Sequence, residues 1–413
     1  MKIRLASVYR ISLSTACVFL FFACFIISHI LMYAVMEWEE YAYSFIKLEY
    51  QSASVAIFTV AALGFLAMAF FLRARNLRVS LPMFFLVGLL IVEGIWWAVA
   101  ALEENTPKDI LLSPATPAFL MCAGFFFVGY VDDVWEPFKR LLLPIACLYL
   151  LMSLVELINF HIMVGGIISA KRIAASSTLY CFIYAFWLLA ACVTVSDDSI
   201  LKYGKIVLGA AVLLALMSVL FRSRSWIIQA LVLLLFVLLR SRIRWRNKGL
   251  AVMTYFVCAV TFVAVFWDVI TYMFSPLLVR LLDDTRTSQL QQFFSQVSWK
   301  QLVMGGGMDA QYKYSAISSN YKYLDNQFLL EMFRYGLLPT LFYTILLVRP
   351  IAQAIFTLDT DLLRRSTVLL LWLAAMAGVS VYFNLNVNIT CIVMLVVCGR
   401  LNRMCSMPKE KRG

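Results

Sequence analysis

Long apolar runs, separated by short polar segments, account for most of this chain. A helix of about 20 apolar residues crosses the hydrocarbon core of a bilayer. Because the runs are continuous and do not alternate with polar residues, they predict helices and not barrel strands. The sequence predicts an all-α polytopic membrane protein with a single integral-membrane domain over residues 1–413. We expect about twelve transmembrane helices, at Ile11–Val35, Ser52–Leu72, Leu81–Leu102, Ile110–Val131, Leu141–Phe160, Ala174–Ser196, Lys205–Phe221, Trp226–Leu239, Gly249–Tyr272, Gln327–Val348, Thr367–Phe383 and Val387–Cys398.

One large polar interval, Tyr272–Asp325, interrupts the apolar runs. Within it we predict an interfacial helix over Ser288–Val303, capped by Thr285 or Thr287 and ended by Gly305-Gly306-Gly307. Its predicted apolar face consists of Leu290, Phe293, Phe294, Val297 and Leu302. A stretch rich in Tyr, Ser and Asn follows, from Gln311 to Tyr323. These aromatic residues suit either sugar stacking or an interfacial aromatic belt.

The distribution of Lys and Arg predicts the orientation of the spans. The chain is 63% hydrophobic and carries a formal net charge of +12, and most of its 35 basic residues fall in segments on one side of the predicted bilayer. That side is expected to be cytoplasmic and to hold both termini, with the large interval on the outside. Since no basic stripe interleaved with aromatic residues occurs in a soluble segment, the charge does not indicate nucleic-acid binding.

Several cations break this pattern by lying in outer segments. They are Lys171 and Arg172 in one loop, Arg222 and Arg224 in a second, and Arg280 and Arg286 in the large interval. Guanidinium groups match phosphate oxygens in a bidentate manner, so their convergence would suit a diphosphate. Alternatively, each Arg reaches lipid headgroups or pairs with a carboxylate such as Asp268, Asp283 or Asp284.

Candidate acid–base groups are few. Glu93 and Glu156 lie within predicted spans, where a carboxylate is either functional or a packing residue that is protonated or paired with an Arg. The only histidines are His29, expected to be a packed polar residue, and His161, expected to be a base or a cap at a span end. Asp325 lies at the start of a predicted span, and we expect it to be a base, a helix N-cap or both. The sequence predicts neither a cofactor nor a metal site.

Two segments carry a resemblance to a known family. The run WKQLVMGGG at Trp299–Gly307 and the run LDNQFLLEMFRYGLLP at Leu324–Pro339 resemble the signature of the bacterial O-antigen polymerase (Wzy) and ligase superfamily. That signature joins a Trp and apolar stretch, a Gly-rich turn, and His-Asn or Asp-Asn at the start of a span that carries a later glycine. Ser223-Arg224-Ser225 resembles the family's Ser/Thr-Arg pattern, and Arg172 its arginine in an earlier outer loop.

The resemblance implies a GT-C-like glycosyltransferase of the bacterial inner membrane, with its active site facing the periplasm. It implies metal-independent polymerisation of undecaprenyl-diphosphate-linked oligosaccharide, which serves as both donor and acceptor, and a Wzz-type chain-length regulator as a partner. Asp325 stands where the ligases carry a catalytic His, which favours a polymerase. In this interpretation Asp325, Arg224 and Arg286 are catalytic, and Arg172, Arg222, Arg280, Asn326 and Tyr323 bind the diphosphate or the sugars. The alternatives are an O-antigen ligase and a polysaccharide-lipid flippase.

Overall fold

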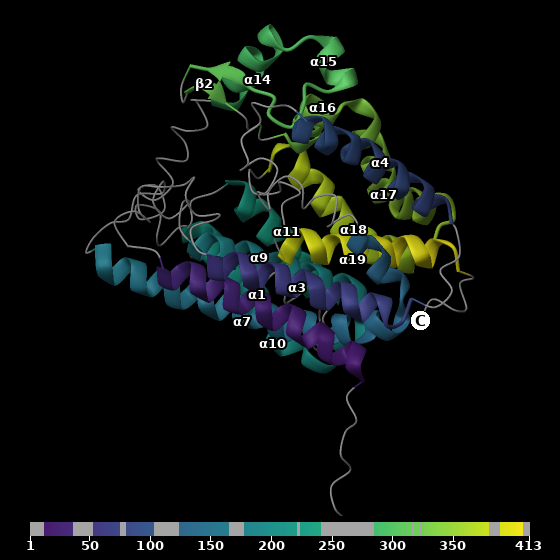
Figure 1. Cartoon of the computed structure of the whole chain (residues 1–413). Helices are drawn as coiled ribbons and strands as arrows, with labels where there is room; N and C mark the ends of the chain where they lie inside the picture. The colour runs from purple at the N-terminus through teal and green to yellow at the C-terminus, as the bar shows by residue number, and fades with distance from the viewer. Residues whose placement is uncertain are drawn as a thin grey trace, which may run out of the picture.

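Helices dominate the computed structural model of this protein (Figure 1), which describes residues 12–35, 53–74, 80–102, 124–164, 177–220, 224–240, 285–315, 318–321, 324, 326–379 and 389–407. The helices before the large interval are α1 (Leu13–Val35), α3 (Ala53–Phe71), α4 (Leu81–Leu102), the 3-10 helix η2 (Phe125–Tyr130), α7 (Asp132–Val164), α9 (Ser177–Val195), α10 (Asp197–Leu220) and α11 (Arg224–Arg240). Those that follow are α14 (Thr285–Gln296), α15 (Trp299–Met304), α16 (Gln327–Tyr335), α17 (Leu337–Phe356), α18 (Thr360–Ala374), the π-helical turn η3 (Ala375–Val379) and α19 (Ile389–Cys405). The strands β1 (Tyr312–Tyr314) and β2 (Ser318–Tyr321) form an antiparallel pair.

Four described helical segments are long and apolar enough to cross a membrane. They are Leu13–Leu31, Leu81–Leu102, Asp132–Ile158 and Leu337–Phe356. Shorter apolar helices lie at Ile57–Phe71, Tyr180–Val195 and Trp226–Arg240. The prediction of a mostly helical protein is confirmed for the described residues, and these helices are candidate membrane spans. The predicted span Gly249–Tyr272, and Ile110–Val131 as far as residue 123, lie outside the described residues.

The predicted span Gln327–Val348 is wrong as a single helix. α16 ends at Tyr335 and α17 begins at Leu337, with Gly336 between them at φ 96° and ψ 177°. This backbone region is open almost only to glycine, so the residue that seemed to lie inside a span instead separates two helices. α17 is the membrane-spanning candidate, and α16 packs against α15 of the polar interval.

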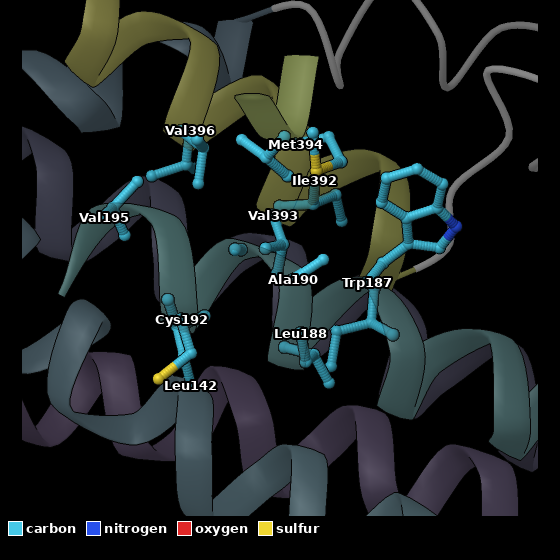
Figure 2. Packing of buried hydrophobic residues seen from close by; sticks show 14 of the residues in the cluster. Leu142, Trp187, Leu188, Ala190, Cys192, Val195, Ile392, Val393, Met394 and Val396 are labelled. Atoms are coloured by element: carbon cyan, nitrogen blue, oxygen red, sulfur yellow. The ribbon is translucent and has the colours of Figure 1, made fainter. Parts of the chain in front are cut away.

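The core of the bundle is built around α9 and α19. All side chains from Cys181 to Ser196 except Tyr184 are buried, as are all those of α19 except Arg403. A helix that is apolar around its whole circumference has to be surrounded by other helices. Accordingly, α9 packs against α7, α10, α18 and α19. Figure 2 shows Ala190 of α9 next to Val393 of α19, and Val195 of α9 close to Val396.

An ion-pair network ties several helix ends together. Asp132, the first residue of α7, pairs with Arg400 and Arg403 of α19, and Asp133 pairs with Arg73 just beyond α3 at 3.6 Å. Arg349 of α17 donates to the Asn402 side chain at 3.1 Å. These contacts bring basic residues that follow α3 or lie in α17 and α19 together with the start of α7 and with Asn402.

Candidate functional site

The described part of the large interval is a small folded module. Its elements are α14, α15 and the β1–β2 hairpin, and the following helix α16 packs with them at one edge of the molecule (Figure 1). We call this the outer module. Its buried apolar residues form a cluster separate from the bundle core, and those residues are Phe293, Val297, Leu302, Ala310, Tyr312, Tyr314, Leu324, Leu330 and Phe333.

This core changes two sequence-based predictions. The single interfacial helix over Ser288–Val303 is wrong, because α14 ends at Gln296 and α15 begins at Trp299. Ser298 starts the second helix through a capping box with Gln301. Phe293, Val297 and Leu302 are buried as expected, whereas Phe294 is 51% exposed.

The tyrosines of the hairpin are packing residues. Tyr312 and Tyr314 are buried, and the Tyr312 ring meets Phe293 edge-on with centroids 5.3 Å apart. Neither ring is available for sugar stacking or for a membrane aromatic belt, so both interpretations are wrong for these two positions. Tyr323 lies outside the described residues.

Glutamine side chains fasten the hairpin to α14. The Gln296 amide accepts from the Lys313 backbone N–H at 2.8 Å and donates to its carbonyl at 2.9 Å. Gln292 accepts from the Ser315 backbone N–H at 2.9 Å. These side chains replace a neighbouring strand for the backbone of β1, which satisfies groups that an edge strand leaves unpaired. The polar face of α14 is therefore a structural surface.

The glycine-rich turn docks on the end of α16. The Gly306 and Gly307 backbone N–H groups donate to the carbonyls of Phe333 and Arg334 at 2.7 and 3.0 Å. The last carbonyls of a helix have no partner within it, so these bonds cap α16. A Cβ on Gly305, at φ 89°, would stand 2.8 Å from the Trp96 ring. The two segments that carry the family resemblance are thus in direct contact.

Helix α4 brings a further set of polar groups to this contact. The Trp96 indole N–H donates to the Tyr335 carbonyl at 3.0 Å. One turn earlier on α4, Glu93 is 2% exposed, and neither of its carboxylate oxygens has a hydrogen-bond partner among the described residues. Glu93 interacts electrostatically with Glu331 of α16.

Glu331 is the one of these carboxyl groups that lies outside a membrane-spanning helix. Burial raises its pKa to about 7, while the nearby Arg334 guanidinium acts to lower it. A carboxyl that titrates near neutral pH suits proton transfer. Sequence reasoning considered Glu93 and Asp325 but not Glu331, although Glu331 stands inside the segment that resembles the family signature.

Of the predicted site residues, the structure describes Asn326 fully. Its side-chain oxygen accepts from the Leu329 backbone N–H at 3.1 Å, so Asn326 is the N-cap of α16. The expectation of an N-cap at Asp325 is wrong. Asp325, Arg172, Arg222 and Arg280 lie outside the described residues.

Two predicted site residues are described by their backbone alone. Arg224 is the first residue of α11, and Arg286 is the second of α14. Their side chains lie outside the description, as does that of His161 in α7. The convergence of arginines from separate outer segments therefore stays a prediction.

One group of side chains in the described residues has the composition of a metal site. His29 of α1, Glu156 of α7 and Cys181 of α9 are all buried, and their ligating atoms lie within 4.8 Å of one another. This group lies in the bundle, not in the outer module.

No protein-family model, curated protein or solved structure matches this chain.

Proposed function

We propose that this chain is a polymerase of lipid-linked oligosaccharides in the bacterial inner membrane, an O-antigen polymerase or one for a related surface polysaccharide. The observation that supports this best is the contact between the glycine-rich turn and the end of α16. This contact brings together the two separate segments that carry the family resemblance, Trp299–Gly307 and Leu324–Pro339. We propose about twelve spans in a GT-C-like arrangement, with the outer module facing the periplasm and both termini in the cytoplasm.

The proposed reaction joins two undecaprenyl-diphosphate-linked glycans. A hydroxyl of the incoming repeat unit attacks the anomeric carbon of the growing chain, the bond from that carbon to the phosphate oxygen breaks, and undecaprenyl diphosphate leaves. Negative charge develops on the leaving diphosphate, so preorganised cations would stabilise the transition state. In this proposal Arg172, Arg224 and Arg286 bind the diphosphate, with Arg222 and Arg280 as further cations of the same outer segments.

The proton of the attacking hydroxyl needs an acceptor. Asp325 remains our proposed base or acceptor-orienting group, with Tyr323 and Asn326 beside the sugar. Glu331 joins it as a candidate, because its raised pKa of about 7 allows it to exchange a proton at neutral pH. The side-chain oxygen of Asn326 caps α16. We therefore propose that only its side-chain NH₂ group donates to sugar hydroxyls.

A complementation experiment tests the proposal. In a deletion strain, the Arg224→Ala and Asp325→Ala proteins should each be present in the membrane at the wild-type level. The strain should nevertheless make glycans of only one repeat unit. Lys300→Ala is the control, because Lys300 is an exposed cation of the outer module with no role in the proposed site. This variant should support a normal ladder. Ladder-length polymer made by Arg224→Ala or Asp325→Ala would contradict these assignments.

The uncomplemented deletion strain distinguishes the alternatives. Loss of a polymerase leaves lipopolysaccharide capped with one repeat unit. Loss of a flippase leaves almost no repeat unit on the lipopolysaccharide, and loss of a ligase leaves long polymer on undecaprenyl diphosphate. Either of the last two results would replace the polymerase proposal.

A further inference from the structure

A compact group of metal-binding side chains lies inside the helical bundle, apart from the outer module. His29, Glu156 and Cys181 come from α1, α7 and α9, and α1 and α9 both pack against α7. Each residue is at most 5% exposed. We propose that these three side chains bind a divalent transition-metal ion of the Zn²⁺ class. This inference does not depend on the proposed polymerase function.

The distances are those of side chains directed at a common point. The Cys181 Sγ lies 2.9 Å from the His29 Nε2 and 3.7 Å from the Glu156 Oε1, and the His29 Nε2 lies 3.7 Å from the same oxygen. Around a tetrahedral Zn²⁺ ion with ordinary bond lengths, N, O and S ligands stand about 3.3–3.6 Å apart. Two separations are close to this range, and metal binding would lengthen the shortest one.

The arrangement does not resemble a catalytic triad. In a triad the carboxylate would orient one imidazole nitrogen while the other nitrogen faced the thiol. Here the thiol and the carboxylate both approach Nε2 of His29. One thiol, one imidazole and one carboxylate together form a ligand set that Zn²⁺ accepts, with a fourth position left for another ligand.

A buried tyrosine beside the group supports a fourth ligand. The Tyr149 ring packs edge-on against His29, with centroids 5.9 Å apart, and Tyr149 interacts electrostatically with Cys181. Its hydroxyl is buried and has no hydrogen-bond partner among the described residues. Buried hydroxyl groups usually have partners, and a water bound to the ion would supply one.

Sequence reasoning did not predict this site because its ligands show no motif spacing. They are 127 and 25 residues apart in the sequence, and the packing of α1 and α9 against α7 brings them together. The sequence predicts His29 as a packed polar residue and Glu156 as either a functional carboxylate or a packing group, and no spacing links either residue to Cys181.

Cobalt provides the test, because a thiolate ligand gives Co²⁺ a near-ultraviolet charge-transfer band. The full-length protein in detergent, stripped with a chelator and titrated with Co²⁺, should bind one ion per chain and develop this band. Because binding releases the thiol proton, the affinity should rise between pH 6 and pH 8. Cys181→Ser should lose the band, whereas Cys192→Ser, which changes a buried cysteine on the same helix, should keep it.

The outcomes decide the proposal in either direction. Absence of the band in monodisperse wild-type protein would show a hydrogen-bonded cluster only and overturn the proposal, as would persistence of the band in Cys181→Ser. If Cys181→Ser does not yield monodisperse protein, His29→Gln replaces it. That variant should retain a thiolate band with Co²⁺ affinity lowered by about tenfold or more, and an unchanged affinity would overturn the site.

Discussion

The Glu331 carboxyl gives the outer module a pH-dependent stability. Its pKa rises to about 7 on folding, so the folded state holds the proton more tightly than the unfolded chain. The contribution of this group to stability is then complete at acidic pH and is lost as the pH rises towards and through 7. Glu331→Gln, which stays neutral, should raise the apparent unfolding temperature at pH 8 by a few degrees and change it little at pH 5.

A second variant should change the pH dependence of stability in the opposite direction to Glu331→Gln. Arg334 acts to lower the pKa of Glu331, so Arg334→Gln should raise that pKa further. Thermal unfolding in detergent, followed between pH 5 and pH 8, should show a steeper loss of stability than in wild type. Parallel pH profiles for wild type, Glu331→Gln and Arg334→Gln would contradict a titrating carboxyl at this position.

At the scale of elements, the turn between α16 and α17 depends on a glycine. A Cβ on Gly336 would stand 2.7 Å from the Val303 carbonyl oxygen, in a backbone conformation that side chains rarely adopt. Gly336→Ala should therefore destabilise the contact with the glycine-rich turn by about 1–3 kcal/mol. Limited proteolysis should then cleave the outer module faster than in wild type.

Gly209→Ala is the matched control for that experiment. Gly209 lies in α10, and a Cβ there would meet nothing within 4 Å. Because alanine favours the helix over glycine, this variant should be neutral or slightly stabilising. If both variants digest at the wild-type rate, the glycine at position 336 is not required by the contact.

The elements that could be predicted from the sequence are those with continuous apolar runs. Leu81–Leu102 was predicted with the bounds that α4 has in the structure. The outer module was predicted less well, because its contacts join residues far apart in the chain. Nothing local indicates that Gln296 pairs with the Lys313 backbone, or that Tyr312 packs into a core with Phe333.

The residues of the candidate site likewise divide into those with a local sequence signal and those that only folding brings together. The segments around Gly305–Gly307 and Gly336 stand out in the sequence by their resemblance to a family signature, whereas no sequence pattern indicates the approach of Glu93 and Trp96 from α4. Glu331 has no spacing signal of its own. Its raised pKa comes from burial, which only the folded chain supplies.

At the scale of the whole molecule, Asp132 connects the start of α7 to the central helix α19. Its carboxylate pairs with Arg400 and Arg403, and the Arg400 guanidinium also lies over the Trp135 ring at 5.6 Å from its centroid. The Arg400 side chain is 11% exposed, so loss of its partner leaves a largely buried charge, although Asp132 itself is half-exposed. Asp132→Asn should destabilise the protein by about 1 kcal/mol at low ionic strength.

The neighbouring carboxylate provides the control that makes this prediction specific. Asp133 pairs only with Arg73 among the described residues, at 3.6 Å, and both side chains are well exposed. Asp133→Asn should therefore shift the unfolding temperature less than Asp132→Asn. Because salt screens exposed pairs more than enclosed ones, the Asp133→Asn effect should vanish at high salt while part of the Asp132→Asn effect remains. Equal shifts that both vanish with salt would show that the α7–α19 connection depends on apolar packing and not on this network.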